Sequence, residues 1–197
     1  DYKSSAKNID LNEVYAGLQI QLLTYMDAIA KQEDIMPAGI FYFSLLEQMV
    51  KAEKNITEEE IEEMIRKNFK MKGLIIADIK IIKMNDNTLK QGSSKLVPAA
   101  ITASGGVNEK WTNGVKKEEF KVLQEYIYKT IKDISREILK GKIDLKPYYK
   151  KGKTPCKYCE YHSICGFHAG QNQNKYNYID QKTKDDILLK MKTELQK

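Results

Sequence analysis

The strongest constraint on the fold is a long helical repeat of apolar residues in the second half of the chain. Large apolar side chains recur at steps of three and four residues, at Phe120, Leu123, Ile127, Ile131, Ile134 and Ile138. This spacing is typical of an amphipathic helix, and Gly141 is well placed to end it. The apolar face of such a helix must be covered by another element, so we expect the helix to pack within an α/β domain.

Two stretches that favour β-strands precede this helix in the sequence. Residues 40–43 form an aromatic, strand-like run, and residues 96–102 form a second one. Residues 104–106 favour a turn, so residues 107–111 are a candidate strand that runs back beside residues 96–102. Residues 13–32 have the apolar spacing of a helix. The order of these elements predicts an α/β fold in which helices pack against a mixed sheet.

Residues 47–94 have a different, more charged character. Thr57 and Glu60 form a capping box, which predicts a short exposed helix with Gly73 beyond its end. Residues 74–86 fit a strand and a helix equally well.

At 197 residues the chain can bury one main core with appendages. We expect an α/β domain over residues 1–150, which carries residues 47–94 as an insertion. Residues 151–170 form a cysteine-containing segment, and residues 171–197 form a polar tail that ends in a short helix.

The chain is basic, and its basic residues are almost all lysines. The formal net charge is +6, and of the 33 basic residues only Arg66 and Arg136 are arginines. The lysines fit solvated helix faces and a phosphate-binding surface equally well. Few arginines argue against reading of base edges, so contact with a nucleic-acid backbone would fit better.

No apolar run approaches the length that spans a bilayer, and no charged and then apolar leader is found. We therefore expect a cytoplasmic protein with no membrane partner.

The three cysteines of the chain lie within ten residues. Cys156, Cys159 and Cys165 have C-x2-C-x5-C spacing, which in a cytosolic protein indicates a metal site more often than disulfides. With His162 or His168 they could form a tetrahedral Cys3His zinc site. A 4Fe-4S cluster normally uses four thiolates. On spacing alone, Zn2+ therefore fits at least as well as a cluster.

A second group of candidate residues lies near the start of the chain. Asp1 and Lys3 are two residues apart, so in a strand they share one face, where a carboxylate can hold Mg2+ and an ammonium can orient the attacking water. Such a pair also occurs by chance in a surface turn. Gln21 and Tyr25 are four apart and share one helix face, although a polar edge residue and a core aromatic would show the same spacing.

These motifs resemble those of a known nuclease family. Asp1-Tyr2-Lys3 followed by Gln21-x3-Tyr25 is similar to the D-x-K and Q-x3-Y motifs of RecB-type nucleases, a branch of the PD-(D/E)xK superfamily. The stretches "DYKSS", "DLNEVYAGLQIQLLTYMDA", "PAGIFYF", "FKMKGL", "GSSKLVP" and "TPCKYCEYHSICGF" together resemble the C-terminal nuclease domain of the AddB family. The resemblance extends to about residue 167 and implies a restriction-endonuclease-like core.

The resemblance also implies roles for individual residues. Asp1 would be a Mg2+ ligand, Lys3 the lysine of the catalytic motif, and Gln21 and Tyr25 would support the site and contact DNA. The three cysteines at positions 156, 159 and 165 would be ligands of a 4Fe-4S cluster whose fourth cysteine lies upstream in such proteins. By analogy, this cluster would act as a structural staple.

The implied function is Mg2+-dependent DNA exonuclease activity within an AddAB-type helicase-nuclease, acting in double-strand break repair and recombination. The partners would be the backbone of single-stranded DNA and an AddA-like helicase-nuclease subunit, with ATP used elsewhere in the parent complex. The family pattern requires a further acidic ligand on the strand before Asp1. We therefore expect that the chain begins inside the catalytic motif and that the isolated piece is inactive or nearly so.

Two other functions fit the same residues. The chain could be a zinc- or iron-sulfur-bearing module that binds DNA or a partner without hydrolytic activity. Alternatively, the nuclease chemistry could belong to another RecB-like protein, such as a free-standing CRISPR-associated exonuclease.

Overall fold

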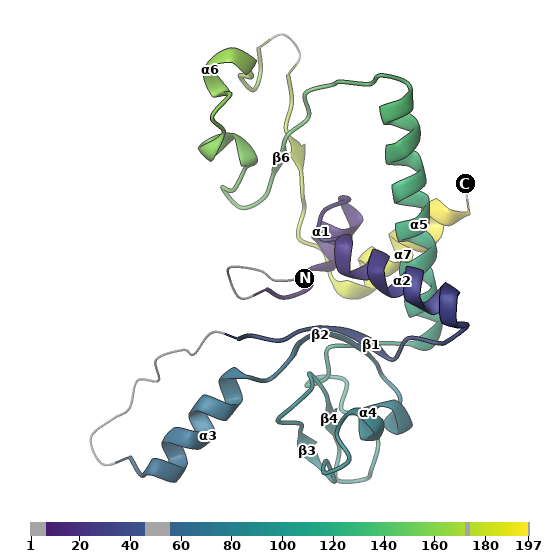
Figure 1. Cartoon of the computed structure of the whole chain (residues 1–197), viewed down its shortest axis with the longest axis vertical. Helices are drawn as coiled ribbons and strands as arrows, with labels where there is room; N and C mark the ends of the chain where they lie inside the picture. The colour runs from purple at the N-terminus through teal and green to yellow at the C-terminus, as the bar shows by residue number, and fades with distance from the viewer. Residues whose placement is uncertain (1–6, 46–55, 172–173, 197) are drawn as a thin grey trace. The chain divides into compact units, whose positions relative to one another are not determined.

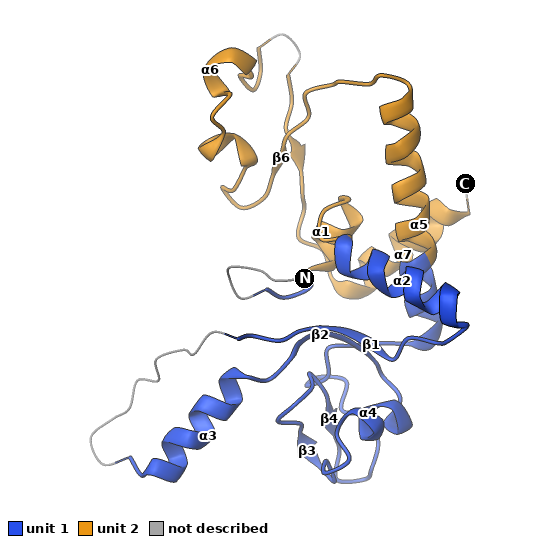
Figure 2. Ribbon diagram, in the orientation of Figure 1, with its two compact units in different colours: residues 1–9, 21–124 blue, residues 10–20, 125–197 orange. Residues whose placement is uncertain are grey.

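Helices and short strands alternate along the chain, and the computed structural model describes them over residues 7–45, 56–171 and 174–196 (Figure 1). They form two units, which Figure 2 shows in different colours. Unit 1 contains residues 1–9 and 21–124, and unit 2 contains residues 10–20 and 125–197.

Unit 1 combines helices with two small sheets. Its elements are α2 (Gln21–Glu33), β1 (Gly39–Tyr42), α3 (Glu58–Asn68), β2 (Lys72–Ile76), α4 (Ile79–Asn85), β3 (Gly92–Ser93), β4 (Ala100–Ile101), β5 (Gly114–Val115) and the first part of α5 (Lys117–Leu139).

The main sheet of unit 1 is mixed and has β2 at its centre. β2 pairs antiparallel with β1, with Phe41 opposite Gly73, and parallel with β5, with Ile75 opposite Gly114. α2 lies on one side of this sheet, and α4 lies with β3 and β4 on the other (Figure 1). The predicted fold class, a mixed sheet flanked by helices, is therefore confirmed. The central strand lies within residues 47–94, the stretch that its charged character predicted to be an insertion.

The core of unit 1 forms where α4 and the loops around β4 cover β2. Ile75 and Ile82 are fully buried there, and Phe41, Met71 and Ile79 pack at the edge of the cluster. The remaining buried members of this cluster are Leu89, Val97, Ala99 and Ile101.

Gly73 permits the close pairing of β1 and β2. Its φ of +153° is rarely adopted by residues with a side chain, and a Cβ atom added there would lie 2.0 Å from the backbone oxygen of Ile40. No rotamer change can relieve a clash with backbone. Any larger residue at this position must therefore move β1 away from β2.

We predict that Gly73→Ala lowers the free energy of unfolding by about 3 kcal/mol, because the added methyl group overpacks the strand pair. Urea titration followed by circular dichroism measures this change. Gly106→Ala is the matched control, since its Cβ would lie 3.5 Å from Thr102 Oγ1, an ordinary contact. Equal losses in the two variants would contradict the role given to Gly73.

The helix predicted over residues 13–32 is in fact two helices, α1 (Leu11–Tyr15) and α2. Gly17 separates them with a φ of +77°. The backbone N–H of Gly17 donates to Val14 O, and that of Leu18 donates to Glu13 O, which is the Schellman pattern of a helix end. Gly17 is a residue that can end a helix, but apolar residues at helical spacing continue on both sides of it, so the sequence predicted one helix.

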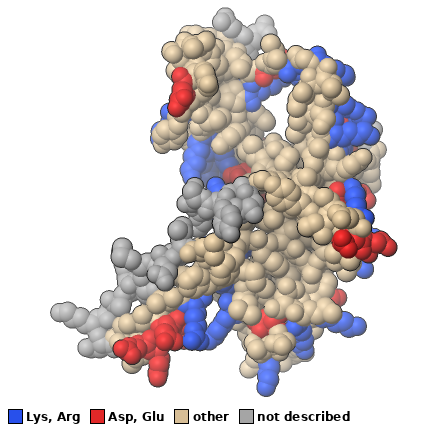
Figure 3. Space-filling model, in the orientation of Figure 1, with Lys and Arg blue, Asp and Glu red and all other residues tan. Residues whose placement is uncertain are grey.

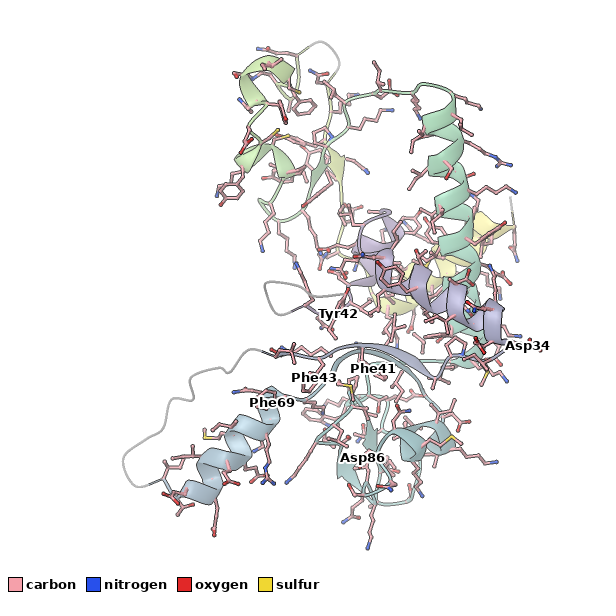
Figure 4. The ribbon with its side chains drawn as sticks, in the orientation of Figure 1. Asp34, Phe41, Tyr42, Phe43, Phe69 and Asp86 are labelled. Atoms are coloured by element: carbon pink, nitrogen blue, oxygen red, sulfur yellow. The ribbon has the colours of Figure 1, made fainter. Side chains whose placement is uncertain are left out.

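The prediction for α3 is confirmed, including its capping box between Thr57 and Glu60. The helix ends at Asn68, however, and Gly73 lies in β2 rather than beside the helix end. The Phe69 ring stacks on Phe43, with 6.0 Å between the ring centroids (Figure 4).

The ambiguous residues 74–86 contain both kinds of element. β2 ends at Ile76, and Asp78 caps α4 by accepting hydrogen bonds from the backbone of Lys80 and Ile81. The predicted strand over 96–102 is reduced to the two residues of β4. The return strand predicted over 107–111 is a single bridge between Ile101 and Val107.

α5 is the predicted long helix, and Gly141 follows its end with a φ of +67°. The buried residues of its apolar repeat lie in the first half, whereas Ile134 and Ile138 are exposed. Among the described residues, no helix combines the length and the apolar character needed to cross a membrane.

Unit 2 is formed by α1, the second part of α5 and the C-terminal elements. These elements are β6 (Tyr148–Tyr149), the 3-10 helix η1 (Pro155–Tyr158), α6 (His162–Cys165), β7 (Asn177–Tyr178) and α7 (Lys184–Leu195). α1 packs on α7, whose residues Ile187, Leu188 and Met191 are buried. The parallel pair β6 and β7 supports the rings of Tyr149 and Tyr178, whose centroids are 5.4 Å apart.

Candidate functional site

α2 carries two of the four residues predicted for the catalytic site. Leu23, Met26 and Ala30 are buried on one face of this helix, which packs on β1. Gln21 and Tyr25 lie on an exposed face, where Gln21 Nε2 donates a hydrogen bond of 2.7 Å to Tyr25 Oη. Their predicted position on one helix face is therefore confirmed, and their catalytic role stays a prediction.

The exposure and hydrogen bonding of Gln21 and Tyr25 determine which groups of a ligand they can contact. The Tyr25 side chain is 46% exposed. Because its oxygen accepts the hydrogen bond from Gln21, its own O–H can be donated outward. An O–H directed to solvent beside an amide is suited to a phosphate oxygen.

Asp1 and Lys3, the other two predicted catalytic residues, lie outside the described residues. Their placement beside α2 stays a prediction of the sequence motif.

Asp86 is a buried carboxylate that belongs to none of the motifs identified in the sequence. Its oxygens accept hydrogen bonds from Ser94 Oγ (2.6 Å) and Thr88 Oγ1 (2.7 Å), next to α4 (Figure 4). Burial alone would raise the pKa of Asp86, but these hydrogen bonds outweigh it and lower the pKa. Ser94 Oγ in turn accepts from the backbone N–H groups of Leu96 and Val97. Asp86 therefore organises the loop that follows α4.

The cysteine segment belongs to unit 2 and is largely exposed. Cys156 is half-buried, Cys159 and Cys165 are exposed, and all three are free thiols. The rings of His162 and His168, the two candidate fourth zinc ligands, meet edge to face with 6.1 Å between centroids. Across residues 7–45, 56–171 and 174–196, no three His, Cys, Asp or Glu side chains are grouped so as to hold a metal ion.

The donor set is chemically suited to iron or zinc, because three soft thiolates lie within ten residues. The chain offers three thiolates for the four iron positions of a 4Fe-4S cluster, so a cluster would need one ligand from elsewhere. Both the 4Fe-4S ligation and the Cys3His zinc alternative stay predictions.

Lys150 anchors the start of this segment. Its side chain is only 13% exposed, and its Nζ lies 2.5 Å from both Asp10 Oδ2 and Glu13 Oε1 at α1. Lys150 and Lys153 exchange two backbone hydrogen bonds of 2.9 Å, which close the turn before η1. At the other end of the segment, the Phe167 ring is buried.

The electrostatics of this ion cluster follow from burial and hydrogen bonding. Burial alone would raise the pKa of Asp10, but hydrogen bonds from Lys150 and Asn12 outweigh it and lower the pKa below its ordinary 3.8. Burial alone would lower the pKa of Lys150, and the two carboxylates raise it above 10.5. No local pattern predicts this contact, since 140 residues separate Asp10 from Lys150.

Comparison with known proteins places the chain in a family. Residues 1–166 match the PD-(D/E)XK nuclease superfamily, and the chain belongs to that superfamily. The membership that the D-x-K and Q-x3-Y motifs predicted is therefore confirmed.

Individual relatives share about two fifths of the sequence. The chain is 39% identical to the B subunit of the ATP-dependent helicase/deoxyribonuclease from Thermoanaerobacter sp. (strain X514), over 100% of this chain and 17% of that protein. It is 40% identical to proteins of the same name from Alkaliphilus metalliredigens (strain QYMF), over 100% of this chain, and Clostridioides difficile (strain 630), over 98% of it. The chain thus spans about 17% of the length of these relatives.

We predict that Lys150→Met lowers the free energy of unfolding by about 2 kcal/mol at pH 7, because two carboxylates lose a charged hydrogen-bond donor. The Asp10 contribution is present above pH 3.8 and is lost as the pH falls through the folded-state pKa. The Lys150 contribution is present below pH 10.5 and is lost as the pH rises through its folded-state pKa.

Urea titrations of wild type and variant from pH 3 to pH 11 measure this difference. Lys151→Met, which removes a neighbouring exposed lysine, is the control. A difference between wild type and Lys150→Met that stays constant to the lowest pH would contradict the assignment.

Proposed function

We propose that this chain is part of the nuclease domain of an AddB-type helicase-nuclease, and that the parent protein hydrolyses phosphodiester bonds of DNA. The observation that carries the proposal is the hydrogen-bonded pair Gln21 and Tyr25 on the exposed face of α2, at the spacing of the Q-x3-Y motif. The superfamily match and the names of the relatives support it. The setting would be double-strand break repair and recombination, with an AddA-like partner and ATP used elsewhere in the complex.

Four residues would divide the work at the site. Asp1 would hold Mg2+, which would activate water and offset phosphate charge. Lys3 would orient the attacking water and neutralise part of the charge that develops on the phosphate. Gln21 would fix the Tyr25 hydroxyl, so that its O–H donates to a phosphate oxygen of the strand.

Lysine-rich surfaces are compatible with backbone contact that has little base preference. Figure 3 shows basic side chains gathered over the C-terminal part of α5, whereas acidic side chains gather at one end of α3. The first turn of α3 contains Glu58, Glu59 and Glu60, so this helix would repel a DNA strand rather than bind it.

We predict that Lys3→Ala and Asp1→Ala each reduce Mg2+-dependent cleavage of single-stranded DNA by at least about 100-fold in the complete parent protein. The complete protein is used because the chain spans about 17% of the length of its relatives. Tyr25→Phe should reduce cleavage by about tenfold, because one phosphate hydrogen bond is lost.

Tyr128→Phe is the matched control, since Tyr128 is also an exposed helical tyrosine but lies outside the motif. Unchanged cleavage in Asp1→Ala or Lys3→Ala would remove the assignment. Equal effects of Tyr25→Phe and Tyr128→Phe would remove the role of Tyr25.

The exposed cysteines favour a second candidate, a metal-bearing module that binds DNA or a partner without hydrolysis. Anaerobic reconstitution with iron and sulfide, followed by visible absorbance spectroscopy, distinguishes a coloured cluster from colourless Zn2+. Loss of DNA binding in Cys156→Ser, without cleavage by any form of the protein, would support this second function.

A further inference from the structure

A pocket of about 440 Å³ lies within unit 2, outside the candidate nuclease site and the cysteine segment. Its walls are formed by α1, the second part of α5, β7 with the residues that follow it, and α7. Its volume is within the range of about 300–1,000 Å³ that is usual for small-molecule sites. The lining residues that matter here are Asn12, Tyr15, Tyr178, Lys182, Lys190 and Glu194.

Two lysines meet at this pocket. Lys182 and Lys190 both line it, and the proximity of Lys182, followed by burial, lowers the pKa of Lys190 below its ordinary 10.5. Like charges in contact repel each other. An anion between them would convert this repulsion into two attractive contacts.

The fold holds both lysines in place. Asn12 clamps the backbone of Lys182, because its Oδ1 accepts from Lys182 N–H at 2.9 Å and its Nδ2 donates to Lys182 O at 3.3 Å. The Lys190 ammonium lies 5.6 Å from the centroid of the Tyr15 ring. Backbone hydrogen bonds therefore hold the Lys182 main chain and a ring contact holds the Lys190 ammonium at the same pocket, and neither contact neutralises a lysine.

Two carboxylates also line the pocket, and neither cancels the lysine pair. Glu194 accepts hydrogen bonds from the hydroxyl groups of Tyr15 and Tyr126, which direct its charge toward the phenols. Asp180 acts on Lys190 only through its charge. The proximity of Lys182 and burial together outweigh the two carboxylates, so the pKa of Lys190 stays below its ordinary value.

The rest of the pocket offers groups that suit a nucleotide. Tyr178 is 65% exposed, and the part of its ring that does not pack against Tyr149 is a surface on which a base can stack. The neighbouring residue Asn177 also lines the pocket, and its side-chain amide can both donate and accept hydrogen bonds.

We propose that this pocket binds one nucleotide, with its phosphate group between Lys182 and Lys190 and its base on Tyr178. The nucleotide can be free or the end of a DNA strand, since both present the same phosphate and base. The assignment to a DNA strand rests on the proposed nuclease function, whereas binding of a free nucleotide does not.

Isothermal titration calorimetry of the 197-residue chain tests the proposal. It is carried out in EDTA, so that no hydrolysis occurs. The titrants are dTMP, thymidine, inorganic phosphate, and oligothymidylate with and without a 5′-phosphate. We expect dTMP to bind more tightly than thymidine or inorganic phosphate. Lys190→Gln and Lys182→Gln should each weaken dTMP binding by about tenfold or more, and Tyr178→Leu should weaken dTMP but not phosphate.

Lys192→Gln is the matched control, because it removes the same charge from the same helix outside the pocket. Equal weakening by Lys190→Gln and Lys192→Gln would overturn the proposal, as would equal affinity for dTMP and thymidine. Preference for the 5′-phosphorylated oligonucleotide would assign the site to a strand end, and binding of dTMP alone would assign it to free nucleotides. If Asp1→Ala leaves cleavage unchanged while dTMP binding persists, the nuclease proposal fails and the pocket stands.

Discussion

Burial of β2 between β1 and β5 is the constraint on which unit 1 depends. This strand contributes four buried residues in succession, 73–76, so both of its faces must be covered. Gly73 lets β1 approach closely enough to pair, and α2 then packs on β1 through Leu23 and its buried neighbours. The exposed position of Gln21 and Tyr25 is therefore a consequence of how the sheet is covered. Whatever these two side chains do, a packed strand pair holds the helix that carries them.

Unit 2 is held by polar contacts between segments that are distant in the sequence. Asp10 and Glu13 bind Lys150, Asn12 clamps the backbone at Lys182, and α1 packs on α7. α1 therefore contacts Lys150, where the cysteine segment starts, and also lines the pocket that contains Lys182 and Lys190. Since α1 is only five residues long, its stability must come from these contacts rather than from helix propensity.

Elements with local signals could be predicted from the sequence. The capping box of α3, the aromatic strand β1 and the repeat of α5 with Gly141 were all readable, because neighbouring residues determine them. The break at Gly17 was missed, since apolar spacing continued across it. The contact of Lys150 with α1 could not be predicted, because it joins segments 140 residues apart. Within the candidate site, the contact between Gln21 and Tyr25 could be predicted, because residues four apart share one helix face. The expected position of this pair beside Asp1 and Lys3 rests on the sequence motif alone.

We propose that a divalent metal binds beside the exposed face of α2. Paramagnetic Mn2+ substitutes for Mg2+ and broadens NMR signals of nearby nuclei, so amide spectra recorded during a Mn2+ titration locate the metal directly. We predict early loss of the signals of Gln21 and Tyr25, suppressed in Asp1→Ala, while signals of α4, which lies on the other side of the same sheet, persist. Persistence of the Gln21 and Tyr25 signals, or their equal loss in wild type and Asp1→Ala, would contradict this placement of the metal.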